Sequence, residues 1–187
     1  MARAFVIRPF GKKKDSKDRE IDFEDVHGSL IGPALAEAGL SGRDTGEIID
    51  AGNIREDMFS LILEADLVVA DISLLNANVF YELGIRHALR RKHTVLIRDR
   101  DSADSPPFDI LTDRYHKYVL DSPAARQESL RQLVDMIQAT QNTYRDTDSP
   151  VFKMLPTLPE ADPSSVAVLP LDFQEEVQRA LASKSKG

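Results

Sequence analysis

Apolar residues along this chain form two patterns, short continuous runs and longer stretches with helical spacing. The continuous runs at residues 4–8, 67–71 and 94–97 are too short for helices and rich in β-branched residues, which is typical of buried strands. Residues 47–50 and 116–120 are less apolar and predict two further strands. The runs do not alternate with polar positions, so we expect both faces of the sheet to be covered.

Stretches with apolar residues at helical spacing separate these strands. The predicted helices span residues 23–38, 54–65, 78–89 and 123–144. Gly32 and Pro33 fall inside the first helix and predict a kink or a break there. Gly39 is the expected C-cap of the same helix, because glycine accepts a positive φ.

Alternating strands and helices predict an α/β domain with a parallel sheet covered on both sides. We expect a flavodoxin-like, Rossmannoid three-layer sandwich, with a five-stranded parallel sheet in the order 2-1-3-4-5 and a C-terminal extension. In that order the first and third strands flank the switch point of the sheet. Ligands of such sheets bind there, at the carboxyl ends of the strands. Arg8 and Asp71 stand at those two ends.

Polar segments mark the loops and the end of the domain. Residues 10–20 are highly charged and are expected to form an exposed, mobile loop, and residues 99–112 form a second loop. Prolines recur in the last part of the chain. We therefore predict a domain at residues 1–146 and an extension at 147–187, which begins as a Pro-rich linker without strand or helix. A short amphipathic helix at residues 171–182 is expected to end it.

The composition argues against several classes of function. The chain has 187 residues, 42% of them hydrophobic, and a net charge of −7, which argues against a general nucleic-acid surface. No apolar run approaches the roughly 20 residues of a membrane span, so we expect a cytoplasmic protein with no membrane partner. There are no cysteines, and the four histidines do not have metal-ligand spacing. Neither a metal nor a bound cofactor is predicted.

Glu82 is the strongest candidate for chemistry. It lies on the early turns of the helix that follows the central strand, where the helix N-terminus favours negative charge. Its neighbours Phe80, Tyr81 and Leu83 are apolar or aromatic, which is unusual company for a solvated glutamate. A positioned carboxylate can act as a nucleophile or stabilise an oxocarbenium-like transition state in glycosyl transfer. The alternative is a surface glutamate that only complements the helix dipole.

Other polar residues near this edge have both a structural and a functional interpretation. Asp57, in the first turn of the preceding helix, is a second candidate catalytic group, either as a proton shuttle or as a ligand of sugar hydroxyls. Its alternative role is to complement the helix dipole. Asn76 and Asn78 suit turn and N-cap positions, and they can also bind a ribose or hold Glu82 in place.

The carboxyl ends of the first and third strands supply the remaining candidates. Asp71 and Ser73 follow the third strand and are expected to line the ligand site. A phospho-acceptor role for Asp71 is disfavoured, because the first strand ends in Arg8 and offers no acidic pair. We expect Arg8 to meet phosphate and Phe10 or Tyr81 to stack on a base. The lysines that follow lack the spacing of a phosphate-binding P-loop.

The run NANVFYELG at residues 76–84, preceded by DIS, resembles the nucleoside 2-deoxyribosyltransferase-like superfamily and its TIR-like relatives. The resemblance covers about residues 3–120. It implies that Glu82 acts at the anomeric carbon of a sugar and that Asp57 contributes from the preceding helix. Asn76 stands where the transferases have an aspartate that assists the base. A non-catalytic nucleotide-sensing or scaffold module is therefore the alternative function.

The segments RPFGKK, GNIREDMF and NANVFYELGIRHAL also resemble a bacterial subgroup that precedes a TRAFs-binding, tetratricopeptide-like region, similar to the N-terminal part of apoptosis signal-regulating kinases. This resemblance implies a downstream tetratricopeptide-like region or signalling partner, and it is compatible with a homodimer. The expected activity is that of an N-glycosidase on the N-ribosyl bond of NAD or another small nucleotide. A third class of function, flavin binding, predicts a yellow protein.

Overall fold

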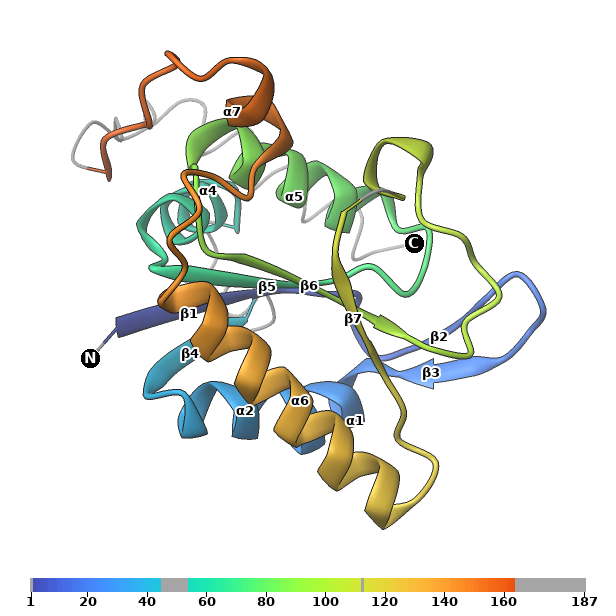
Figure 1. Ribbon diagram of the computed structural model, residues 1–187. Coiled ribbons are helices and arrows are strands. Elements are labelled where there is room, and N and C mark those ends of the chain that lie inside the picture. The colour runs from blue at the N-terminus through green and yellow to red at the C-terminus, as the bar shows by residue number, and fades with distance from the viewer. Residues whose placement is uncertain (1, 45–53, 112, 164–187) are drawn as a thin grey trace.

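Five parallel strands form the centre of the described part of the chain (Figure 1). The computed structural model describes residues 2–44, 54–111 and 113–163, without the side chains of residues 43–44 and 54–57. The strands lie in the order β4 (Leu40–Asp44), β1 (Ala2–Ile7), β5 (Leu67–Asp71), β6 (Thr94–Asp99) and β7 (Tyr115–Tyr118). In chain order this is 2-1-3-4-5, as predicted, and each pairing is parallel. The flavodoxin-like three-layer architecture is confirmed.

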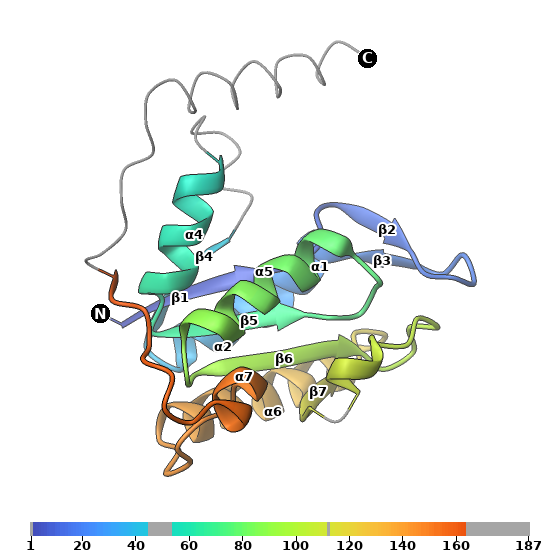
Figure 2. The ribbon, with the colours of Figure 1, turned by 90° about the horizontal axis from the view of Figure 1, so that it is seen from above.

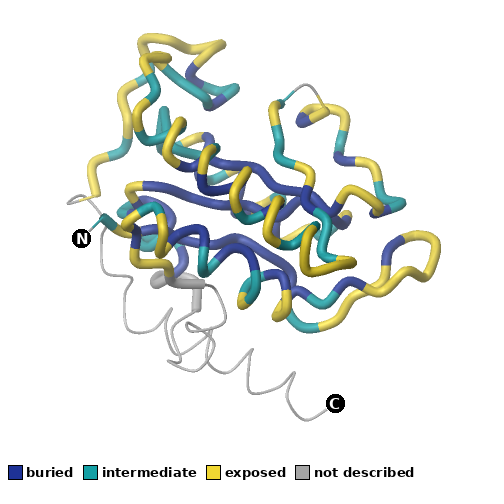
Figure 3. Tube along the Cα trace, turned by 60° about the horizontal axis from the view of Figure 1, so that its bottom comes forward, coloured by how far each residue is buried: buried dark blue, intermediate teal, exposed yellow. Residues whose placement is uncertain are grey.

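Helices cover both faces of this sheet (Figures 1 and 2). One face carries α1 (Phe23–Val26), η1 (His27–Ile31), α2 (Gly32–Glu37) and α6 (Pro123–Gln141), and the other carries α4 (Ile54–Glu64) and α5 (Ala77–Leu89). Alternate residues of β1 enter opposite cores: Val6 packs toward α1 and α6, and Ile7 toward α4 and α5. The strands are therefore buried on both faces, as Figure 3 shows.

The first helical segment changes its winding where the sequence predicts a kink. The π-helical turn η1 separates α1 from α2, and the N–H of Gly32 donates to the carbonyl of His27. Pro33, which has no N–H to donate, follows directly after this turn, so the change of winding falls where the helix ladder lacks a donor. Gly39 has a φ of +75° at the end of α2, so its predicted C-cap role is confirmed.

The second strand lies earlier than predicted. β4 begins directly after Gly39 and pairs with β1 in the register Ala2–Leu40 to Val6–Asp44. Its sequence, LSGRD, has only one large apolar residue, which suits β4 because it is an edge strand of the described sheet. The segment expected to form this strand, residues 47–50, lies outside the described residues.

The charged segment after β1 forms a hairpin, so the prediction of a loop is wrong, whereas the predicted exposure of most of its residues is confirmed. β2 (Lys12–Lys14) and β3 (Glu20–Asp22) pair antiparallel beyond the edge of the main sheet. The Lys12 ammonium lies 3.1 Å from the Glu20 carboxylate across the hairpin. The Asp15 carboxylate accepts backbone hydrogen bonds of 2.9 and 3.0 Å within the turn. Opposite charges and turn contacts thus replace the apolar pattern on which the prediction relied.

A short helix follows α6, although no helix was expected from residue 147 as far as 171. α7 (Pro150–Met154) begins at Ser149, whose hydroxyl accepts the backbone N–H groups at the helix start. A serine N-cap followed by proline is a strong start signal for a helix. Phe152 is buried against the domain, and α7 packs on α5. The predicted helix at residues 171–182 lies outside the described residues.

The segment that carries α7 is also fastened to the sheet by polar contacts. The Asp148 carboxylate accepts the N–H groups of His93, at 2.6 Å, and Thr94, at 3.2 Å, where β6 begins. The Arg91 guanidinium donates to two backbone carbonyl groups later in the segment, at 2.6 and 2.9 Å. Residues 147–158 are therefore part of the folded body. Within the described ranges, no helix is long and apolar enough to cross a membrane.

Candidate functional site

The carboxyl ends of β1 and β5 lie side by side at the centre of the sheet, where Ile7 pairs with Ala70. α5 follows β5 through a short loop, so its N-terminus lies at the same edge. The side-chain oxygen of Asn76 accepts the N–H groups of Asn78, at 3.0 Å, and Val79, at 3.3 Å. This confirms Asn76 as the N-cap of α5.

Glu82 faces inward from the second turn of α5. Its side chain is 7% exposed, between the buried residues Val79 and Leu83. Burial raises the pKa of Glu82 to about 7. Among the described residues, no hydrogen bond or ion pair reaches its carboxylate. Glu82 is thus not the solvated glutamate of the alternative interpretation. A nearly buried carboxyl group is costly to ionise, and such groups occur mainly at functional sites.

Asn78, Glu82 and Arg86 follow one another at intervals of four residues and share one face of α5. Asn78 is exposed, Glu82 is nearly buried and Arg86 is fully buried, so this face leads from solvent into the protein. The Arg86 guanidinium donates to the carbonyl groups of Ile62, at 2.8 Å, and Ala65, at 2.9 Å. It also donates to two carbonyl groups just before β6, at 2.9 and 3.3 Å.

Arg86 joins α5 to the C-terminal end of α4. Both helices return antiparallel to the strands, so they run parallel to each other and pack together. Glu82 lies one turn before Arg86 on the same face of α5. The structure does not describe the side chain of Asp57, so the catalytic role of Asp57 stays a prediction. The sequence interpretation missed Arg86. Its position could have been noticed, because it is a charged residue on an apolar face of the predicted helix.

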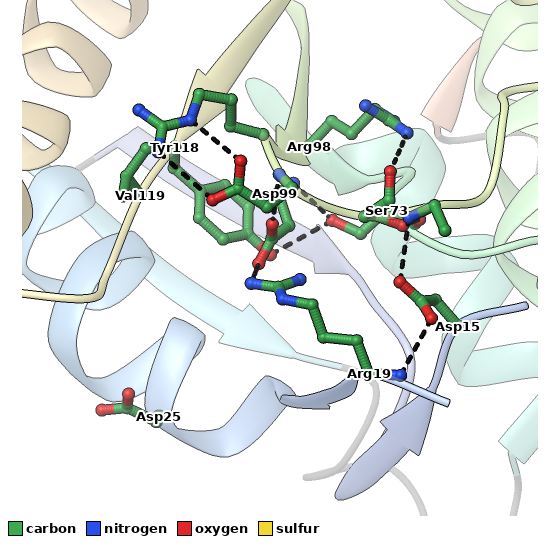
Figure 4. Close-up of polar contacts among 12 residues, drawn as sticks. Asp15, Arg19, Asp25, Ser73, Arg98, Asp99, Tyr118 and Val119 are labelled. Carbon is green, nitrogen blue, oxygen red and sulfur yellow. Dashed lines mark hydrogen bonds and ion pairs between the residues drawn. The ribbon is translucent and has the colours of Figure 1, made fainter. Parts of the chain in front are cut away.

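Asp71, Ser73 and Tyr118 form a closed hydrogen-bond network beneath this edge (Figure 4). Asp71 accepts from the backbone N–H of Ser73, at 2.9 Å, from the Ser73 hydroxyl, and from the Tyr118 hydroxyl, at 2.9 Å. Burial raises the pKa of Asp71 to about 6 and that of Tyr118 well above its usual value. Asp71 and Ser73 were expected to line the ligand site. Both side chains are fully buried and brace the edge, and their contact with a ligand stays a prediction.

The same network connects the edge with the hairpin of β2 and β3 (Figure 4). The Ser73 hydroxyl accepts the N–H of Asp99 at 2.7 Å, and the Asp99 carboxylate accepts the Arg19 guanidinium at 2.9 Å. Asp15 accepts the N–H of Ala103 at 2.9 Å. The hairpin is thus held against the loop that follows β6, at the carboxyl side of the sheet.

Arg8 and Phe10 lie at the end of β1. The Arg8 guanidinium is buried and donates two hydrogen bonds of 2.9 Å to the Glu24 carboxylate, which it holds at a lowered pKa. Glu24 also accepts the N–H of Gly11 at 3.2 Å. The Arg8 guanidinium stacks on the half-buried Phe10 ring, 5.5 Å from its centre. A phosphate would have to share Arg8 with Glu24, and the predicted phosphate contact stays a prediction.

Tyr81 is not brought to the face of α5 that carries Glu82. Its side chain is 61% exposed, and successive helical residues point about 100° apart. Of the two aromatic residues expected to stack on a base, only Phe10 is partly enclosed. In the described ranges, no cluster of His, Asp and Glu side chains is arranged to hold a metal ion.

Comparison with known proteins gives no family assignment. No family model matches the chain, and no curated protein matches it. The interpretation of the site therefore rests on its own geometry.

Proposed function

We propose that this protein is an N-glycosidase that cleaves the N-ribosyl bond of NAD or another nucleotide, with Glu82 as the carboxylate that meets the anomeric carbon. One observation supports this most directly. Glu82 is nearly buried, lacks a partner among the described residues and lies near the switch point of a parallel sheet, where ligands of such folds bind. The resemblance of NANVFYELG to the deoxyribosyltransferase-like and TIR-like motif supports the same role.

A nearly buried carboxylate that has no partner among the described residues suits a reaction that develops positive charge. When the base departs, its nitrogen keeps the bonding pair and the ribose carbon becomes cationic; water then adds to that carbon and releases a proton. An interaction that strengthens as this charge develops lowers the barrier. Burial raises the pKa of Glu82 to about 7, and a cationic centre beside it would favour the ionised form.

A pyridinium N-riboside such as NAD matches this environment best among nucleotides. Its ring nitrogen is positively charged before cleavage, and the base leaves as a neutral molecule. The positive charge therefore lies beside Glu82 in the bound state and moves to the sugar in the transition state. Asn78, on the same helix face toward solvent, would bind ribose hydroxyls together with Asp57. Phe10, packed on Arg8, would stack on one of the bases.

The test is to incubate the full chain with NAD, with AMP and with a deoxynucleoside, and to separate free base by chromatography. We expect nicotinamide release from NAD by the parent and a loss of at least about 100-fold in Glu82→Gln. Glu37→Gln, a substitution at an exposed glutamate of α2, is the matched control. A Glu82→Gln variant that releases base at the parental rate would refute the mechanism.

The pH dependence gives a second readout of the same residue. If ionised Glu82 is the active form, kcat/KM rises about tenfold per pH unit and levels off above the raised pKa of about 7. An unburied glutamate would give a plateau that begins near 4.5, its ordinary pKa. The midpoint of the profile thus distinguishes the buried carboxyl group from an exposed one.

A non-catalytic nucleotide sensor or scaffold module is the second candidate, and one observation favours it. Asn76, which replaces the aspartate of the transferases, uses its side-chain oxygen to cap α5 and has no proton to donate from it. A thermal shift with NAD in the absence of free base would favour the sensor over the enzyme. Release of nicotinamide would exclude it.

A further inference from the structure

Arg8 and Glu24 form an ion pair in which only the arginine is buried. The Arg8 guanidinium donates to both oxygens of the Glu24 carboxylate at 2.9 Å, and the N–H of Gly11 donates to one of these oxygens at 3.2 Å. The Arg8 side chain is 3% exposed, whereas the Glu24 side chain is 58% exposed. The donors, which we call the Arg8 cradle, therefore meet at one carboxylate that solvent can reach.

The Arg8 cradle lies at the carboxyl end of β1, next to the end of β5. α1, which carries Glu24, and α5, which carries Glu82, cover opposite faces of the sheet at this point (Figure 1). The cradle and Glu82 thus lie on the two sides of the switch point, where ligands of such sheets bind. Gly11 has a φ of +61°, and a methyl group built on it would lie within 4 Å of no heavy atom of the described residues beyond its chain neighbours.

A second ion pair in the same helical turn shows what distinguishes the first. Asp25 accepts the Arg126 guanidinium through both oxygens, at 2.8 and 3.0 Å, and both side chains are partly exposed. If that pair opens, water can solvate either partner. Arg8 has no such access to water, and a buried guanidinium is costly without an anion. Glu24 can turn to solvent, so another anion can take its place at Arg8.

We propose that Glu24 is a built-in competitor for a phosphate site at the Arg8 cradle, and that a nucleotide binds by placing its phosphate there and turning the Glu24 carboxylate out to solvent. A guanidinium pairs with phosphate through two parallel hydrogen bonds, as it does with carboxylate. A terminal phosphate has close to two negative charges and a further oxygen for the N–H of Gly11. A nucleoside without phosphate cannot make the exchange. The assignment of the phosphate to a nucleotide rests on the proposed function, whereas the exchange of anions does not.

Thermal unfolding of the full chain in inorganic phosphate, with chloride keeping the ionic strength constant, tests the exchange without any turnover. Glu24→Gln deprives the buried guanidinium of its charged partner, and phosphate is expected to raise the Tm of this variant saturably, by at least about 3 °C more than that of the parent. Asp25→Asn, at the partly exposed pair, is the matched control and is expected to respond like the parent. Glu24→Asp, which keeps the charge on a shorter side chain, is the second variant if Glu24→Gln does not fold. A phosphate response no larger than that of Asp25→Asn in every folded Glu24 variant would overturn the proposal.

Isothermal titration with AMP and with adenosine tests whether a nucleotide supplies the phosphate. Glu24→Gln is expected to bind AMP at least about tenfold more tightly than the parent does, with no change for adenosine. Equal AMP affinities, or an equal gain for adenosine, would refute the competitor role even if the parent releases base through Glu82. Tighter AMP binding by Glu24→Gln would support the competitor role even if the parent released no base, which would refute only the N-glycosidase.

Discussion

Replacing Glu82 by glutamine is expected to stabilise the protein at alkaline pH, even though it is expected to abolish turnover. The pKa of Glu82 is raised from 4.5 to about 7 in the folded protein, so folding favours the protonated carboxyl group. Below about pH 4.5 both states are protonated, and no pH-dependent effect remains. Between pH 4.5 and about 7, Glu82 loses its proton in the unfolded chain before it does so in the folded protein. The unfolded chain therefore gains stability relative to the folded state. Above about pH 7 the buried Glu82 destabilises the folded protein to the full extent.

The size of the effect follows from the same interval. A rise in pKa from 4.5 to about 7 corresponds to about 3 kcal/mol of free energy of unfolding at high pH. Glutamine has similar shape and does not titrate. Its own burial without a partner has a cost, but that cost is the same at every pH. The prediction therefore concerns the change with pH of the difference between variant and parent.

Urea unfolding followed by circular dichroism, at about pH 5 and about pH 8, measures this difference. Between the two pH values, the free energy of unfolding of Glu82→Gln is expected to rise by about 2–3 kcal/mol relative to that of the parent. Glu37→Gln, at an exposed position of α2, is expected to gain none. If Glu82→Gln gains no more than this control, the carboxyl group is not buried as described. The proposed reason for its reactivity then fails with it.

Three further substitutions test the framework around the site. Tyr118→Phe removes a buried donor to Asp71 and is expected to cost about 1–3 kcal/mol in urea unfolding, with the larger loss above pH about 6, where Asp71 is ionised. Asn76→Ala is expected to cost about 1 kcal/mol through loss of the α5 N-cap, while Asn76→Asp keeps the stability within a few tenths. Arg86→Lys cannot reach all four carbonyl groups and is expected to cost about 3 kcal/mol in thermal unfolding at neutral pH.

The elements that could be predicted from sequence are those whose burial is local. Residues 67–71 are apolar throughout because β5 is central and covered on both faces, and their position was predicted correctly. The N-cap at Asn76 was also predicted correctly, since capping depends on residues only two and three positions away. β4 was misplaced because an outer strand needs few apolar residues. The β2–β3 hairpin was missed because charge pairs across its strands replace hydrophobic pattern.

The orientation of the site residues depends on partners distant in sequence, which local patterns do not reveal. Asp71 was placed correctly at the end of β5, but its inward orientation follows from Tyr118, 47 residues later. Arg8 was placed correctly at the end of β1, yet its carboxylate partner Glu24 comes from α1. Glu82 was identified because its helix carries a recognisable motif. Its apolar neighbours indicated that it is not solvated, but the buried Arg86 one turn later, whose carbonyl partners come from other elements, was missed.

Attachment of residues 147–158 to the sheet determines where the protein can be shortened. A truncation after position 146 would leave the N–H groups of His93 and Thr94 without the carboxylate of Asp148 and would uncover the apolar surface beneath Phe152. It would also remove the carbonyl groups that receive Arg91. The shortest fragment suitable for crystallisation or spectroscopy therefore extends at least through Leu158.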